Sequence, residues 1–130
     1  MYEELKKIED ELEGEEYFSG GLGYYFICDT VPITWKNVET IKEILIKNKV
    51  IGEDDNVELS KIEDPLSDFE LISDKWHFSE DIKKGFIDIL KEADGYYSYI
   101  PDGAYGCVWT IRRLLQKGEE LVILEFYISD

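Results

Sequence analysis

Apolar residues recur at helical spacing in three parts of the chain. In residues 2–13 the apolar positions that share one helical face are Tyr2, Leu5, Ile8 and Leu12. Glu and Lys occupy most of the remaining surface of this helix. The acidic run EDELEGEE, residues 9–16, overlaps the end of this helix. Because the helix dipole disfavours negative charge at that end, we expect the helix to fray there, before the segment SGGLG separates it from the next element.

A second helix is predicted within the segment PITWKNVETIKEILIKNKVIG, residues 32–52. Thr34 or Asn37 is expected to cap its N-terminus, and Asn48 and Gly52 mark its end. Its buried face is expected to contain Val38, Ile41 and Leu45.

The third segment, FSEDIKKGFIDILKEADG, has the clearest helical pattern. Ser79 is the expected N-cap, Glu80 and Asp81 occupy the first turn, and Gly95 stands where a C-terminal glycine belongs. The apolar positions of its buried face are Ile82, Phe86, Ile89, Leu90 and Ala93.

Residues 53–75 are mixed and acidic, without a clear period. Pro65 indicates a break in regular structure. The segment is therefore predicted to be a loop that contains short strands near 57–60 and 68–72.

Two parts of the chain have the alternation of β-strands. In GYYFICDT, residues 23–30, both faces are apolar, which indicates a central strand. From Tyr96 onwards, YYSYI, AYGCVWTIRRLL and ELVILEFYISD are separated by PDG and QKGE, which are turn sequences. An alternative makes residues 108–117 a helix that ends at Gly118, but the run YGCVWTI favours a strand.

Together these elements predict one α+β domain over residues 1–130. Two or three helices pack on a mostly antiparallel sheet of about four to six strands, which ends in a C-terminal three-stranded meander. At 130 residues such a domain is large enough to bury a core without metal or disulfide crosslinks.

The charge is the most informative feature of the composition. Thirty acidic residues face fourteen basic ones, which gives a net charge of −16. Solubility requires only about 2–8 units in a small domain. Such a field repels phosphate backbones and anionic lipids and attracts basic surfaces. Nucleic acid and membranes are therefore not expected to be direct partners, whereas a basic protein is.

The location is expected to be the cytoplasm. Two cysteines, Cys28 and Cys107, each lie in an apolar, strand-like run, and buried free thiols are the simpler interpretation than a disulfide between them. The N-terminal residues have neither the basic start nor the apolar stretch of a signal peptide, and no window approaches the length of a membrane span.

Signatures of catalysis are weak throughout the chain. The glycines of GGLGYYF precede a strand and no Gly-Lys-Ser/Thr follows, and EDDNVELSKIED lacks the spacing of a calcium loop. Cys107 could act as a nucleophile with His77 as its base, but acidic surroundings disfavour the thiolate form of a cysteine. We therefore expect no catalytic residue, no metal site and no cofactor. Arg112 and Arg113 are adjacent, and one is expected to pair with Glu125 or a loop carboxylate.

Carboxylates next to aromatic residues are typical of a protein interface. Tyr and Trp supply rigid apolar anchors, and charge around them steers the partner. The predicted partner-binding residues are Glu53, Asp54, Asp55, Glu58, Glu63, Asp64, Asp68 and Glu70, with Trp76, Tyr97 and Tyr99 as anchors.

In size, acidity and α+β pattern, the chain resembles the immunity proteins of bacterial polymorphic and contact-dependent toxin systems. The stretches behind this resemblance are EDELEGEE, GEDDNVELSKIED and YGCVWTIRRLLQKGEELVILEFYISD. It implies a non-enzymatic inhibitor that binds a basic toxin domain, commonly a nuclease, and covers its active site. Two alternatives stay open: a phage inhibitor that mimics DNA, and a small hydrolase or ligand-binding domain with its site in the sheet concavity.

Overall fold

The computed structural model describes residues 1–15, 18–19, 22–32, 40–101 and 110–129. The helices in this part of the chain are α1 (Tyr2–Glu15), α2 (Ile41–Lys47), α3 (Pro65–Lys75) and α4 (Glu80–Glu92). The strands are β1 (Phe18–Ser19), β2 (Leu22–Pro32), β3 (Glu58–Lys61), β4 (Gly95–Ile100), β5 (Thr110–Lys117) and β6 (Glu120–Ser129).

The described strands form one antiparallel sheet in the order β1-β2-β6-β5-β4-β3. Strands β4, β5 and β6 are neighbours in both sequence and space, so the predicted α+β class and C-terminal meander are confirmed. Residues 110–117 are strand, as preferred over the helical alternative. The predicted turn at Asp102 and Gly103 lies outside the described residues.

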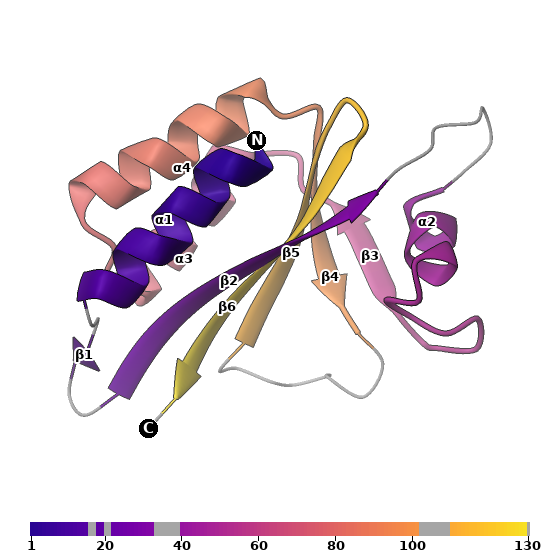
Figure 1. Ribbon diagram of the computed structural model, residues 1–130, viewed down its shortest axis with the longest axis horizontal. Coiled ribbons are helices and arrows are strands. Elements are labelled where there is room, and N and C mark those ends of the chain that lie inside the picture. The colour runs from indigo at the N-terminus through magenta and orange to yellow at the C-terminus, as the bar shows by residue number, and fades with distance from the viewer. Residues whose placement is uncertain (16–17, 20–21, 33–39, 102–109, 130) are drawn as a thin grey trace.

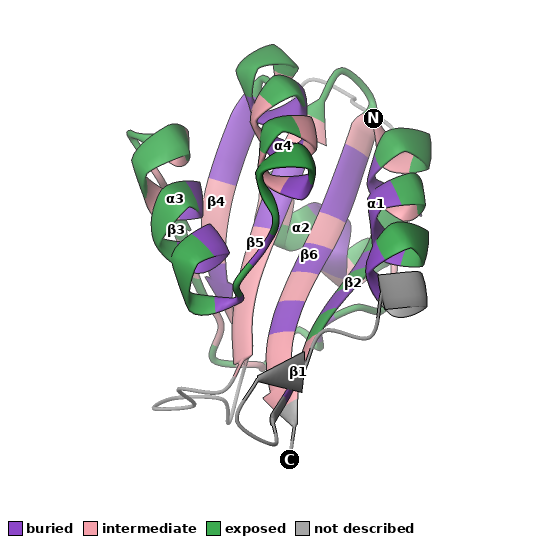
Figure 2. Ribbon diagram, turned by 90° about the vertical axis from the view of Figure 1, so that its left-hand side faces the viewer, coloured by how far each residue is buried: buried purple, intermediate pink, exposed green. Residues whose placement is uncertain are grey.

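Helices lie on both faces of the sheet. Figures 1 and 2 show α1, α3 and α4 over one face and α2 over the other. Strand β6 faces both layers because its side chains alternate: Val122, Leu124 and Phe126 join the major core under α1, α3 and α4, whereas Leu121 joins the minor core under α2. The minor core also contains Ile44, Leu45, Ile51, Tyr99 and Leu114.

Helix α3 corrects the prediction for residues 65–75, which are neither a loop nor a strand. Pro65 occupies the first turn of this helix, where its missing N–H removes no hydrogen bond, and the Asp64 side chain accepts from the backbone N–H of Ser67. Phe69 and Ile72 face the major core. The predicted strand near 57–60 is present as β3, shifted by one residue.

Two helix ends also differ from the prediction. The N-cap of α2 is Thr40, whose side chain accepts from Glu43 N–H while the Glu43 carboxylate accepts from Thr40 N–H. Thr34, Asn37 and Val38 lie outside the described residues. Helix α4 begins after Ser79 as predicted, but it ends at Glu92 with Ala93 as its C-cap, and Gly95 is already part of β4.

Helix α1 continues two residues past the predicted range, to Glu15. It covers the outer edge of β2, where Glu9 accepts hydrogen bonds from the backbone N–H and the Sγ of Cys28, at 3.1 and 3.2 Å. A carboxylate placed on an unpaired strand N–H satisfies that donor and blocks further strand pairing. Within the described residues, no helix is both long and apolar enough to cross a membrane.

Candidate functional site

The carboxylates predicted to bind a partner lie near the β3 edge of the sheet, but some are on its minor-core side and others on its major-core side. Glu53, Asp54 and Asp55 follow α2, which packs on the minor-core side. Asp68 and Glu70 lie on α3, which packs on the major-core side. The members exposed to solvent are Glu53, Asp54, Glu58, Glu63, Asp64 and Glu70. They are therefore divided between the two sides of the molecule.

Several of these carboxylates have structural roles. Asp55 accepts a hydrogen bond from the backbone N–H of Gly52 at 2.6 Å. Asp64 accepts from the hydroxyl and the backbone N–H of Ser67, which lowers the pKa of this carboxyl. Both residues fix the local chain rather than stand free for a partner.

Asp68 is the centre of a network beneath α3. Its Oδ1 accepts from Arg113 Nη2 and its Oδ2 from Arg113 Nε, both at 2.9 Å, and Oδ2 also accepts from the Tyr96 hydroxyl at 2.7 Å. Burial opposes the charged guanidinium, but hydrogen bonds and the opposite charge of Asp68 keep the pKa of Arg113 raised. Burial, followed by the charge of Asp68, raises the pKa of Tyr96. The network ties α3 to β4 and β5.

Two of the three predicted aromatic anchors are buried. Trp76 is 0% exposed, and its Nε1 donates to the carbonyl oxygen of Tyr127 at 3.1 Å. Tyr99 is 6% exposed and belongs to the minor core. Tyr97 is partly exposed and packs against that core. Trp76 and Tyr99 are therefore core residues and offer no anchor, because the apolar face of each ring is used by the fold.

The prediction for the arginine pair is confirmed. Arg112 Nε donates to Glu125 at 3.0 Å across β5 and β6, and Arg113 binds Asp68. The two side chains point to opposite faces of the sheet because they are adjacent in a strand. Both cations are thus engaged within the fold.

Nucleophilic chemistry is disfavoured at Cys28. The thiol is buried and free of any disulfide. Burial, followed by hydrogen bonding to Glu9, raises the pKa of Cys28 to about 12, so the thiol stays protonated. His77 packs edge-on against the Tyr24 ring, with centroids 5.0 Å apart. Cys107 lies outside the described residues, and the described part of the chain contains no cluster of three metal-ligating side chains.

Replacing Glu9 with Gln is expected to lower the free energy of unfolding by about 1 kcal/mol, because a neutral amide oxygen then replaces the carboxylate that accepts from Lys6 and Cys28. Partial burial opposes ionisation, but these hydrogen bonds hold the pKa of Glu9 below its ordinary value of 4.5. The stabilisation is therefore present above pH 4.5 and is lost as the pH falls through the folded pKa.

Urea titrations of both proteins at about pH 7 and about pH 3.5 test this expectation. The difference in free energy of unfolding between the wild type and Glu9→Gln should be smaller at the lower pH. Asp10→Asn, an exposed neighbour on α1, is the control and should change stability by less than about 0.5 kcal/mol. An equal loss at both pH values would contradict the assigned role of Glu9.

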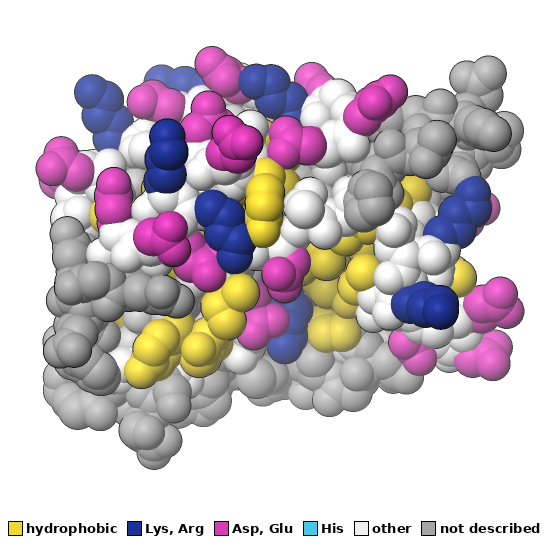
Figure 3. Space-filling model, viewed as in Figure 1, with side chains coloured by type: hydrophobic (Ala, Val, Ile, Leu, Met, Phe, Trp, Pro, Cys, Tyr) yellow, Lys and Arg dark blue, Asp and Glu magenta, His cyan; other side chains and the backbone are white. Residues whose placement is uncertain are grey.

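A groove of about 480 Å³ separates α1 from α4. Its floor is apolar and consists of Ile8, Ile82, Gly85 and Ile89. Its rim carries the carboxylates of Glu4, Glu11, Asp81, Asp88 and Glu92. The lining also contains one cation, Lys7. In Figure 3, carboxylates and lysines gather over this part of the molecule, above α1 and α4.

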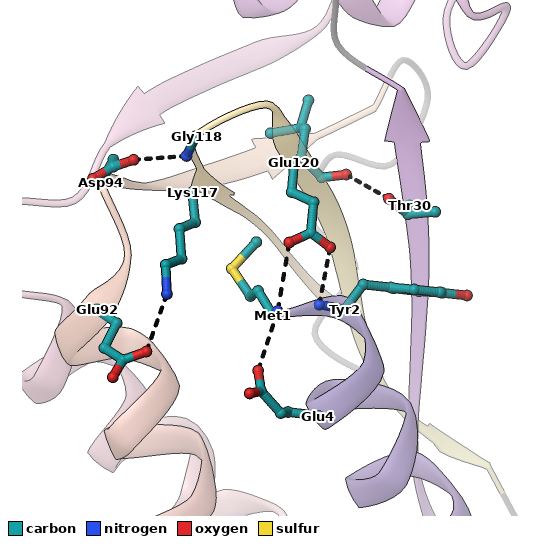
Figure 4. A network of polar contacts seen from close by, with 10 residues as sticks. Met1, Tyr2, Glu4, Thr30, Glu92, Asp94, Lys117, Gly118 and Glu120 are labelled. Atoms are coloured by element: carbon teal, nitrogen blue, oxygen red, sulfur yellow. Dashed lines mark hydrogen bonds and ion pairs between the residues drawn. The ribbon is translucent and has the colours of Figure 1, made fainter.

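The rim differs from one end of the groove to the other. At one end, Glu4 binds the amino group of Met1 at 3.1 Å and Glu92 binds Lys117 at 3.1 Å (Figure 4). Glu120 also binds Met1, at 3.4 Å, so this end is held to the β5–β6 turn. The carboxylates of Glu11, Asp81 and Asp88 make no ion pair or hydrogen bond with described residues. These three carboxylates are therefore unpaired within that part of the chain.

The groove residues were missed by sequence reasoning because they come from helices about seventy positions apart. A signal was present in each helix. In α4, Asp81 and Asp88 flank Ile82 and Ile89 one heptad apart, and in α1 Glu11 lies three positions from Ile8. Such a border of carboxylates beside an apolar stripe marks the rim of a helical face.

Comparison of the chain with models of protein families, with curated proteins and with solved structures finds no match.

Proposed function

We propose that this protein is a non-enzymatic inhibitor that binds and neutralises a basic protein toxin, a nuclease. The observation behind this proposal is that the excess of negative charge is not used to hold the fold together. The carboxylates in ion pairs with described cations are Glu4, Glu9, Asp68, Glu70, Glu92, Glu120 and Glu125.

Most exposed carboxylates of the two acidic segments are outside this set, among them Glu11, Glu53 and Glu58, whereas Glu70 pairs with Lys83. Unpaired surface charge of one sign raises the encounter rate with a partner of the opposite sign, and its effect falls as salt is added. The arginines, which a protein that binds nucleic acid would present to phosphate, are instead paired with Asp68 and Glu125. The charge distribution therefore favours a basic protein as partner.

The product of the gene directly upstream is the partner to test. We expect the purified chain to bind it with a Kd below about 1 μM at about 0.15 M salt and to abolish its nuclease activity at equimolar concentration. Association should slow as salt is raised, because attraction between exposed charges is screened. Surface plasmon resonance and a DNA or RNA cleavage assay provide these measurements.

Cytochrome c, a basic protein without nuclease activity, is the control for unspecific charge attraction. The chain should bind it far more weakly than the candidate toxin. Absence of binding to the upstream product, or equal binding to both proteins, would overturn the proposed function.

A further inference from the structure

We infer that the groove between α1 and α4 is the docking site for one basic, amphipathic helix of the partner protein. This inference rests on the proposed function and specifies where the inhibitor binds and what it recognises. The site differs from the residue 53–70 cluster that the sequence suggested, because none of the residues that line the groove belongs to that cluster.

The chemistry of the groove selects an amphipathic occupant. Ile8, Ile82 and Ile89 form an apolar floor that a purely charged segment would leave unmatched. The unpaired carboxylates of Glu11, Asp81 and Asp88 stand above this floor and complement Lys or Arg side chains on the flanks of the occupant. A segment with apolar residues on one face and basic residues beside them satisfies both features.

The walls of the groove favour a helix over an extended segment. Both walls are helices, whose backbone N–H and C=O groups are paired internally. A strand laid between them would find no backbone partners, whereas a helix satisfies its own backbone groups. Helices α1 and α4 contain 14 and 13 residues. At 1.5 Å per residue they are about 20 Å long, which matches an occupant of roughly three to four turns.

Gly85 opens the middle of the groove. A Cβ atom at this position would lie 3.4 Å from Cδ1 of Ile8, so a side chain here would occupy the floor between the two helices. The absence of a side chain leaves space for an apolar residue of the occupant, in the manner of helices that dock into hydrophobic grooves.

A synthetic peptide tests the inference independently of the natural partner. The probe is a fluorescein-labelled peptide of about 16 residues, made of Leu, Lys and Ala with Leu at helical spacing. Its control has the same composition in scrambled order. Fluorescence anisotropy at about 0.15 M salt should show binding of the patterned peptide and at least about fivefold weaker binding of the scrambled one.

Two variants with the same change in charge locate the site. The groove variant combines Glu11→Gln, Asp81→Asn and Asp88→Asn, and the loop variant combines Glu53→Gln, Asp54→Asn and Glu58→Gln; each raises the net charge from −16 by three. The groove variant should weaken peptide binding about tenfold, while the loop variant stays within about twofold. Lys7→Glu removes the cation of the lining and should tighten binding several-fold.

The outcomes separate this inference from the proposed function. Equal losses in both triple variants, equal binding of both peptides, or no binding of the patterned peptide would overturn the groove as the site. If the upstream product binds the wild type and the groove variant equally well, the inhibitor proposal stands and the groove inference is wrong. If that product binds neither, the inhibitor proposal is wrong. Circular dichroism of each variant controls for folding.

Discussion

Replacing Phe126 with Ala is expected to lower the free energy of unfolding by about 3–5 kcal/mol. Phe126 is 0% exposed and lies on the central strand β6, between the sheet and the three helices of the major core. The centroids of five other aromatic rings lie within 6.4 Å of its own, those of Phe26, Phe69, Trp76, Phe78 and Phe86. Truncation would leave a cavity among these rings and remove their edge and stacking contacts.

Urea titration followed by far-ultraviolet circular dichroism measures this loss. Leu71→Ala is the matched control, because Leu71 lies on α3 and is 72% exposed. It should change stability by less than about 0.5 kcal/mol. A loss below about 1 kcal/mol at Phe126 would mean that the major core is not packed as described.

Replacing Asp68 with Ala is expected to cost about 2–4 kcal/mol, because it leaves the Arg113 guanidinium and the Tyr96 hydroxyl without their acceptor. The Arg113 and Asp68 side chains are 16% and 20% exposed, so water can replace the lost bonds only in part. The double variant Asp68→Ala with Arg113→Met should recover part of the lost free energy of unfolding, since it removes the partly buried Arg113 charge together with its partner.

Glu70→Ala on the same helix provides the comparison. Glu70 pairs with Lys83 at 3.6 Å and is 63% exposed, so its removal should cost less than about 0.5 kcal/mol. Equal effects of Asp68→Ala and Glu70→Ala in urea titrations would show that the Asp68 network adds no more stability than a surface ion pair.

The elements with strong periodicity were predictable from the sequence. Within the described residues, helices α1 and α4 and strands β2, β4, β5 and β6 follow their apolar patterns, because each buries apolar side chains in a core. Helix α3 was missed because Pro65 was interpreted as a breaker, although an Asp followed by Pro is also a helix start. The stripe of Phe69, Ile72 and Trp76 was hidden by carboxylates on the opposite side of the same turns.

The candidate site was less predictable for a physical reason. Sequence shows that a residue is aromatic or charged, but not which face of its element points inward when both faces are mixed. Trp76 therefore looked like an anchor beside carboxylates, yet it caps α3 and fills the major core. The groove depends on α1 and α4 lying side by side, which is a tertiary contact that neither helix encodes by itself.

The order of strands in the sheet determines when this chain can fold. Strand β2 pairs with β6 along its length, so that Phe26 lies opposite Phe126, one hundred positions later. Closing such a distant contact has an entropic cost, which slows folding relative to a domain that has only local contacts. During synthesis, the apolar side chains of α1 and β2 cannot complete their core until β6 has been made, about one hundred residues after β2.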